Sequence, residues 1–195
     1  MANKYFNTEF VDKALIFAIN AHHNTERRGK QLPYIIHPME VVSIVATMTN
    51  DPDLLAAAAL HDTVEDCDVS IETISKEFND RVAKIVENES DKFTPGISEQ
   101  DSWKERKQAA IKRIKGLPIE GKIVALGDKL SNARAMLLDY KAIGDKLWER
   151  FHCSDPKEHE WHYRGLVDSL SELKDTEAYK EFNNIVNELF ANLHK

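Results

Sequence analysis

The sequence predicts an all-α protein of about nine or ten helices in a single domain. Apolar residues recur at three- and four-residue steps along most of the chain, which is the spacing of one helix face. Proline and glycine fall between these periodic stretches, where they start or stop helices. No stretch of useful length alternates apolar and polar residues as a half-buried strand does. With 195 residues, the chain is long enough to bury a core of its own.

Five helices are expected in the N-terminal half. Thr8 or Asn7 can cap the first, whose apolar residues form a stripe. Pro38 fits the first turn of the second, because its missing N–H is not needed there. Pro52 opens a third, alanine-rich helix, and two short helices follow it. The expected spans are about 8–24, 38–50, 52–66, 70–78 and 80–89.

The C-terminal half continues the helical pattern after a loop. Pro95 and Gly96 mark the segment 92–98 as the clearest loop in the chain. The next helix is basic, and a solvated face is the expected reading of its charges. Gly144 separates the long helix before it from those that follow, and a linker at that point is left open. The expected spans are about 103–115, 119–140, 145–152, 154 onward, and 176–194.

Composition restricts the function. The net charge of −7 argues against binding a nucleic acid polymer, which requires a basic surface. Cys67 and Cys153 are far apart and in no metal-like spacing, so a reducing, cytoplasmic setting is expected. The N-terminus has no apolar signal core, and no run approaches the roughly 20 apolar residues of a membrane span. We therefore expect a soluble protein with a small-molecule partner.

A cluster of polar residues follows the alanine-rich run. His61, Asp62, Glu65 and Asp66 stand at the end of a helix that is otherwise apolar. Burying a polar group without a partner costs on the order of 2–7 kcal/mol, and a divalent metal would supply such a partner. On a continuous helix the first two side chains would form one layer that holds the metal. The second two would form a layer that acts on its water. The alternative is a solvated acidic helix end.

Two further residues can complete a metal site. His37 stands at the start of the second helix. Asp128 lies amid apolar residues of the helix expected at about 119–140, four positions before Asn132. Two imidazoles and two carboxylates without thiolates suit Mn²⁺, Fe²⁺, Co²⁺ or Zn²⁺ better than Ca²⁺. Together with His61 and Asp62, they give the candidate ligand set.

The remaining candidates are weaker. Arg27, Arg28 and Lys30 precede His37 and would rim the same pocket, where Arg can stack on a base or grip a phosphate; a basic surface turn is the alternative. His22 or His23 is either a second layer behind the metal or a simple helix end. Tyr34 is expected to pack rather than to contact a ligand. Surface positions are expected for the other histidines, His152, His159, His162 and His194.

Three motifs in this order resemble the HD-domain phosphohydrolases, and most closely the small alarmone hydrolases and the hydrolase half of RelA/SpoT proteins. They are Arg27-Arg28 with Pro33-Tyr34-Ile35-Ile36-His37-Pro38, then His61-Asp62-Thr63-Val64-Glu65-Asp66, then Gly127-Asp128-Lys129-Leu130-Ser131-Asn132. The resemblance implies an HD-domain helical bundle over residues 1–195, with a core at about 8–140 and a helical C-terminal extension at 145–195. One departure is Ala125, where the family often has a lysine.

The resemblance also implies a function. A Mn²⁺ ion, or another divalent transition metal, would be held by His37, His61, Asp62 and Asp128. The reaction would remove the 3′-pyrophosphate from ppGpp or pppGpp to give GDP or GTP and pyrophosphate. Glu65 and Asp66 would position or deprotonate the attacking water. Substrate contacts would come from Arg27 over the guanine, Arg28 beside it, and Asn132 at the ribose. A phosphatase of nucleoside 5′-monophosphates or NADPH, a nucleotide sensor without turnover, and a homodimer are left open.

Overall fold

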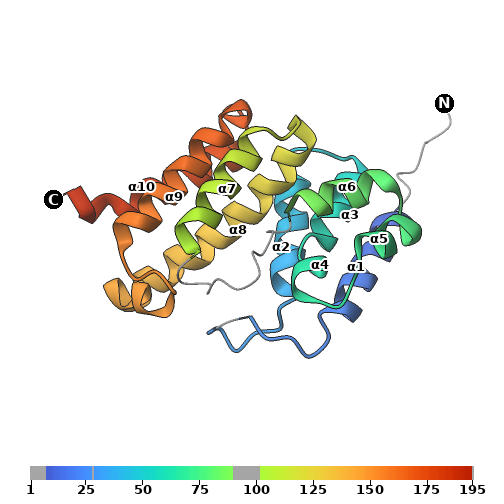
Figure 1. The fold of residues 1–195 in the computed structure, drawn as a ribbon, viewed down its shortest axis with the longest axis horizontal. Coiled ribbons are helices and arrows are strands. Elements are labelled where there is room, and N and C mark those ends of the chain that lie inside the picture. Colours follow the sequence, from blue (N-terminus) through green and yellow to red (C-terminus); the bar gives the residue numbers. More distant parts are fainter. Residues whose placement is uncertain (1–7, 28, 90–101, 195) are drawn as a thin grey trace. The chain divides into compact units, whose positions relative to one another are not determined.

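The computed structural model describes residues 8–27, 29–89 and 102–194, and within these ranges the protein is all-α, as the sequence predicts (Figure 1). Ten α-helices and three 3-10 helices cover these ranges, and the β-structure found there is one isolated bridge between Glu26 and Pro33. Arg28 and the predicted loop at 92–98 lie outside the described residues. None of the described helices is both long and apolar enough to cross a membrane.

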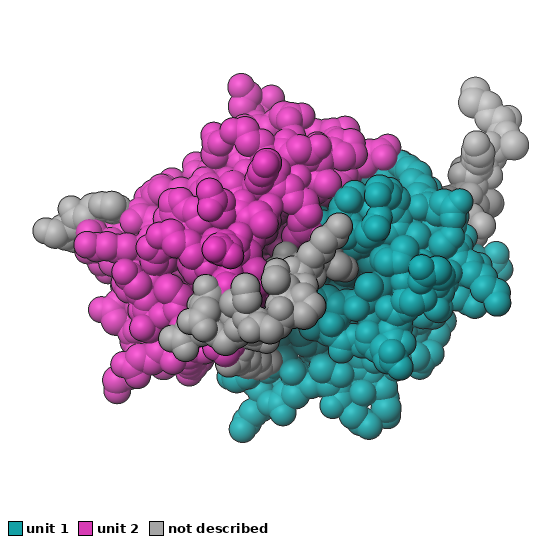
Figure 2. Space-filling model, viewed as in Figure 1, with its two compact units in different colours: residues 1–90 teal, residues 91–195 magenta. Residues whose placement is uncertain are grey.

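The chain divides into two compact units, residues 1–90 and 91–195, which we call the N-terminal and C-terminal units (Figure 2). The boundary at residue 90 differs from the division near residue 140 that the resemblance implies. The reason lies in the longest helix, which ends at Ile143 and packs against helices that follow it in the chain. The assignment of one HD domain with a C-terminal extension stays a prediction.

The N-terminal unit is built around its alanine-rich helix. This helix, α3 (Pro52–Leu60), packs against α1 (Glu9–Ala21), α2 (Ile36–Val45) and α6 (Asp80–Glu89). The alanines at 56–59 have no exposed surface, because small side chains let the neighbouring helices approach closely. The unit also contains α4 (Thr63–Asp66) and α5 (Ile71–Glu77).

Polar contacts fix the start of this buried helix. Its cap, Asp51, accepts a hydrogen bond from the backbone N–H of Asp53 at 2.9 Å. Arg81 on α6 then donates to the carboxylates of both residues, at 2.8 Å to Asp51 and 2.9 Å to Asp53. At the other end the helix stops at Leu60, so the single helix predicted over 52–66 is interrupted before α4 begins.

The helices predicted at 80–89 and 103–115 begin and end as expected, whereas several other helix boundaries differ from the prediction by a few residues. The first helix ends at Ala21 rather than near residue 24, and Thr8 precedes it without a side-chain capping bond. The second begins at Ile36 and ends at Val45, earlier than the predicted 50. Ser70 does cap α5, accepting from the N–H of Thr73 at 3.2 Å.

The described part of the C-terminal unit, residues 102–194, contains four α-helices. The long α8 (Ile119–Ile143) packs against α10 (Glu177–Phe190), and α7 (Trp103–Lys115) packs against α9 (Pro156–Ser169). Gly144 ends α8 with a φ of +59°, which a residue with a side chain rarely adopts. The segment predicted as a helix at 145–152 is the 3-10 helix η1, Gly144–Arg150. Two more 3-10 helices, η2 (Ser171–Leu173) and η3 (Ala191–His194), flank α10.

Two histidines of this unit are not on the surface, contrary to the prediction. His159 and His162 are only 4% and 7% exposed. Both pack edge-on against Trp103, and His159 also lies against Trp148. Burial lowers the pKa of both imidazoles, most strongly that of His162. His152 is exposed, as expected, and the side chain of His194 lies outside the described residues.

Candidate functional site

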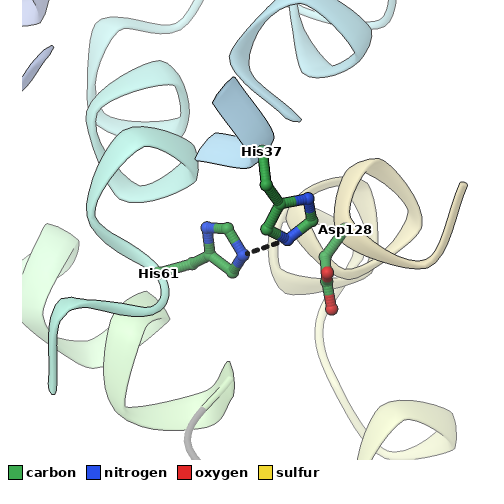
Figure 3. A group of neighbouring side chains, drawn as sticks. All are labelled: His37, His61 and Asp128. Carbon is green, nitrogen blue, oxygen red and sulfur yellow. Dashed lines mark hydrogen bonds between the residues drawn. The ribbon is translucent and has the colours of Figure 1, made fainter. Parts of the chain in front are cut away.

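Two imidazoles and a carboxylate meet where α3 ends and α2 begins. His61 follows the last residue of α3, and His37 is the second residue of α2. Their Nε2 atoms lie 3.3 Å apart, with both side chains buried (Figure 3). One carboxylate oxygen of Asp62, Oδ2, is 3.0 Å from the Nε2 of His61 and 3.5 Å from that of His37. Three atoms able to bind a cation therefore converge within the N-terminal unit.

The backbone fixes the tautomer of one imidazole. The Nδ1 of His61 lies 2.9 Å from the carbonyl oxygen of Ala58, one of the last carbonyls of α3. A carbonyl can only accept, so Nδ1 carries the proton and donates it. In the neutral form of this ring Nε2 then carries a lone pair, and this atom lies next to His37 and Asp62. The same bond satisfies a carbonyl that the end of the helix leaves without an intrahelical partner.

This donor set fits a divalent metal ion. When the His61 ring is neutral, its Nε2 and the Oδ2 of Asp62 are both acceptors, and the two atoms lie 3.0 Å apart. A proton on the Nε2 of His37 can satisfy only one of them at a time, whereas a divalent cation would bind all three atoms. Imidazole nitrogens with carboxylate oxygens, and no thiolate among them, are ligands of first-row divalent transition metals.

Tyr34 holds the carboxylate in place. Its hydroxyl donates to the Oδ2 of Asp62 at 2.7 Å, while its ring stacks on His22 with centroids 4.7 Å apart. Burial raises the pKa of this hydroxyl, and the charges of Asp62 and Asp66 raise it further. The hydroxyl therefore stays protonated and donates. The residue was expected to pack rather than to contact a bound molecule, and its ring does pack on His22, while its hydroxyl makes a bond to Asp62 that was not foreseen.

His22 stacks on Tyr34, which in turn donates to Asp62, so His22 lies one contact away from the candidate metal ligands. It is buried, and its Nδ1 lies 3.2 Å from the Sγ of Cys67. Burial lowers the pKa of His22, although the nearby carboxylates of Asp62 and Asp66 oppose this shift. Burial and the same two carboxylates raise the pKa of the Cys67 thiol. Both groups are thus held in their neutral forms. His23 is exposed and takes no part.

The two predicted catalytic acids lie on the short helix α4. Glu65 and Asp66 are both exposed, in contrast to the buried histidines. The N–H of Asp66 donates to the carbonyl of Asp62 at 2.9 Å, so one helical turn separates Asp66 from this candidate metal ligand. The continuous helix predicted through these residues is interrupted, because α3 ends at Leu60 and α4 begins at Thr63, although His61 and Asp62 keep right-handed helical backbone angles.

The basic turn is a compact loop within the same unit. The N–H of Arg27 donates to the carbonyl of Leu32 at 2.8 Å, and Gly29 has a φ of +71°. A surface hollow of about 470 Å³ lies beside this turn, and His22 and Leu32 are part of its lining. Arg27 is half-buried, and Arg28 lies outside the described residues.

The last predicted ligand lies on α8 in the C-terminal unit. Asp128 is buried, and the Nδ2 of Asn132 donates to its Oδ1 at 2.5 Å. Lys129, the next residue, donates its ammonium to Oδ2 of the same carboxylate. Sequence reasoning paired Asp128 with Asn132 by their spacing but gave Lys129 no role. Its adjacency to an isolated acid was the available signal.

Comparisons with known proteins were made for the whole chain. The HD domain family profile matches residues 14–146. The chain is 32% identical over 136 residues to the guanosine-3′,5′-bis(diphosphate) 3′-pyrophosphohydrolase of Vibrio cholerae, which covers 66% of this chain and 18% of that protein. It is 41% identical over 81 residues to the protein of the same name from Aquifex aeolicus, covering 42% of this chain and 12% of that one. The chain thus spans less than a fifth of the length of these relatives.

A solved structure is similar over nearly the full length. It is a metazoan ortholog of SpoT, described as hydrolysing ppGpp and acting in starvation responses. The two share 25% sequence identity with a TM-score of 0.70, over 94% of this chain and 95% of that one. Unlike the two bacterial relatives, this structure is matched over almost its whole chain.

Proposed function

Because the chain belongs to the HD-domain family, we propose that it is a metal-dependent hydrolase that removes the 3′-pyrophosphate from ppGpp and pppGpp. The products would be GDP or GTP and pyrophosphate. The names of the bacterial relatives and the activity described for the metazoan protein support this substrate. The observation of this chain that carries the proposal is the convergence of His37, His61 and Asp62 in the N-terminal unit.

We propose His37, His61, Asp62 and Asp128 as the metal ligands; Figure 3 draws the two histidines and Asp128. Asp128 is included because it is a buried carboxylate in the third motif of the family. Mn²⁺ is the ion we propose because the resemblance to the alarmone hydrolases implies it; the ligand types themselves also suit Fe²⁺, Co²⁺ and Zn²⁺. When bound, such an ion makes a coordinated water more acidic and neutralises charge on phosphate oxygens.

Glu65 and Asp66 are proposed to handle the attacking water. Both are exposed on α4, so a water molecule and a substrate can reach them, and both are carboxylates able to accept a proton. The water oxygen forms a bond to phosphorus, and the bond between that phosphorus and the 3′-oxygen of the ribose breaks. A carboxylate of Glu65 or Asp66 would take one proton from the water and return it to the 3′-oxygen, which leaves as the 3′-hydroxyl of GDP or GTP.

Substrate binding is assigned to three residues. Arg27, half-buried beside the surface hollow, is proposed to stack on the guanine, with Arg28 nearby. Asn132 is proposed at the ribose. Its amide also donates to Asp128, so it would join a ligand to the nucleotide.

The substrate is tested by incubating the purified protein with Mn²⁺ and separating the products by chromatography. The panel is ppGpp, pppGpp, GMP and NADPH. We expect GDP or GTP and pyrophosphate from the first two, and little turnover of the others. Faster phosphate release from GMP or NADPH would replace the alarmone assignment with a nucleotide phosphatase. Absence of turnover throughout, with Mn²⁺ bound, would favour a nucleotide sensor.

The catalytic roles are tested with Glu65→Gln and Asp66→Asn. Each should lower kcat by about 100-fold or more, the scale of general acid–base catalysis, while metal analysis still finds Mn²⁺. Asp68→Asn is the matched control, because Asp68 is an exposed acid two residues beyond Asp66. Its kcat should stay within about two-fold of the wild type. Equal losses in all three variants would show a general charge effect and contradict the assignment.

A further inference from the structure

Asp128 is already neutralised by a cation of its own helix. Its side chain is 8% exposed, and the ammonium of Lys129 donates to its Oδ2. The other oxygen, Oδ1, accepts from Asn132. A buried carboxylate without a counter-charge is costly, so this ammonium stabilises Asp128 in the absence of a metal.

The two oxygens have partners of different kinds. Asn132 is neutral, so its bond to Oδ1 is compatible with a nearby metal ion and keeps the carboxylate oriented. Lys129 is positively charged, and its ammonium on Oδ2 repels any cation that binds the same oxygen. Lysine carries its charge on a flexible four-carbon stem, and the side chain of Lys129 is 21% exposed, so the ammonium can leave Asp128 without entering the core.

We infer that Lys129 is a resident counter-ion that competes with the metal for the Oδ2 of Asp128 and, once displaced, binds a phosphate oxygen of the substrate. The inference rests on the proposed function for the metal at Asp128. The proposed substrate carries anionic phosphate oxygens, which are strong acceptors for a displaced ammonium. Lys129 therefore exchanges one anionic partner, the carboxylate of Asp128, for another, a phosphate oxygen of the substrate.

Mn²⁺ binding to the metal-free full-length protein, without substrate, tests the first half. In Lys129→Met the competitor is gone, so Mn²⁺ should bind about ten-fold more tightly, as expected for removing a unit charge beside a divalent one. Lys129→Arg keeps the charge and should stay within about three-fold of the wild type. An Lys129→Met variant that binds Mn²⁺ equally or more weakly would overturn the inference.

Lys141→Met is the matched control. Lys141 lies on the same helix, twelve residues further on, and pairs with Glu188 at 2.7 Å. At 1.5 Å per residue it is about 18 Å from Lys129 along α8, more than twice the Debye length of about 8 Å at physiological salt. Its Mn²⁺ affinity should match the wild type. Equal tightening in both variants would mean that net charge alone is responsible and would also overturn the inference.

Pyrophosphate binding to the Mn²⁺-loaded protein tests the second half, without requiring catalysis. We expect Lys129→Met to weaken it by about ten-fold and Lys129→Arg to restore most of the affinity. Unchanged pyrophosphate affinity in Lys129→Met would remove the phosphate role. Failure of the proposed function gives a different result. It would be seen in the wild-type protein alone, as no binding of Mn²⁺ or no cleavage of ppGpp, without any comparison of variants.

Discussion

Replacing Tyr34 by Phe removes a single hydroxyl from the proposed metal site. That hydroxyl donates to the Oδ2 of Asp62 at 2.7 Å, the oxygen that also faces His61 at 3.0 Å. The hydroxyl also interacts with the carboxylate of Asp66, and the ring stacked on His22 stays in place, so the variant removes the polar contacts of the hydroxyl and little packing. We expect Mn²⁺ to bind more weakly, because a carboxylate without its hydrogen-bonded partner is less well oriented toward the ion.

The magnitude follows from the character of the bond. A hydrogen bond to a charged group contributes about 1.5–3 kcal/mol, and 1.4 kcal/mol corresponds to a ten-fold change in affinity. The Asp62 side chain keeps 18% of its surface exposed, so water can replace part of what the hydroxyl supplied. The lower end of the range applies, and Mn²⁺ affinity in Tyr34→Phe should fall by about ten-fold. Isothermal titration of the metal-free protein measures it.

Tyr179→Phe is the control for loss of a tyrosine hydroxyl. Tyr179 on α10 donates to the backbone carbonyl of Val167 at 3.1 Å, within the C-terminal unit. This variant should lose about 1 kcal/mol of unfolding free energy and keep its Mn²⁺ affinity. If Tyr34→Phe binds Mn²⁺ within two-fold of the wild type, the reasoning that places Asp62 among the ligands through this hydroxyl is refuted.

Three further predictions concern metal, helix end and pH. Removing metal with a chelator should lower the Tm, because an ion at 100 times its Kd stabilises the folded state by about 2.7 kcal/mol; an unchanged Tm in a differential scan would argue against a resident ion. His61→Asn retains a donor for the carbonyl of Ala58, whereas His61→Gln does not place one there, so both should lose Mn²⁺ but only the second should lose stability as well; equal stability in urea unfolding would contradict this. Burial holds the pKa of His162 well below 6.5, so the unfolded chain takes up the proton first and stability falls as pH drops below about 6.5. Urea unfolding of His162→Phe should show a shallower loss between pH 6.5 and 5, by up to about 2 kcal/mol, and an unchanged slope would exclude His162 as its source.

The all-α fold could be predicted from periodicity and helix breakers because those signals are local. The alanine run predicted a buried helix, and the structure confirms it, since residues 56–59 have no exposed surface. Helix ends were less accurate, because they depend on contacts that short-range patterns do not contain. Arg81 joins Asp51 and Asp53 from thirty residues away, for example, and fixes the start of α3.

The error on His159 and His162 has a physical cause. Their helix, α9, is rich in charged residues, which made its histidines read as surface groups. Yet His159, His162, Tyr163 and Leu166 recur at three- and four-residue steps, and all are buried. Counting the imidazoles as aromatic groups in that stripe would have predicted their burial beside Trp103.

The candidate site shows the same limit. Residue types and order indicated His37, His61 and Asp62, because imidazoles and carboxylates at the end of an apolar helix require partners. Sequence reasoning gave no role to the hydroxyl of Tyr34 or to the ammonium of Lys129, because no motif spacing links either residue to the carboxylate that it contacts. Both act on a carboxylate by direct contact, and only the folded structure shows which carboxylate a neighbouring donor reaches.

The packing of α3 explains how the polar side chain of His61 is held in a buried position. The helix packs closely against α1, α2 and α6, and its alanines at 56–59 have no exposed surface. His61 therefore leaves α3 at a fixed point, and its bond to the carbonyl of Ala58 sets the direction of the ring. The ring then meets His37 because α2 packs on α3. The placement of His37 and His61 thus follows from the hydrophobic core of the N-terminal unit, so a variant that loosens α3 should lose metal affinity before it loses its fold.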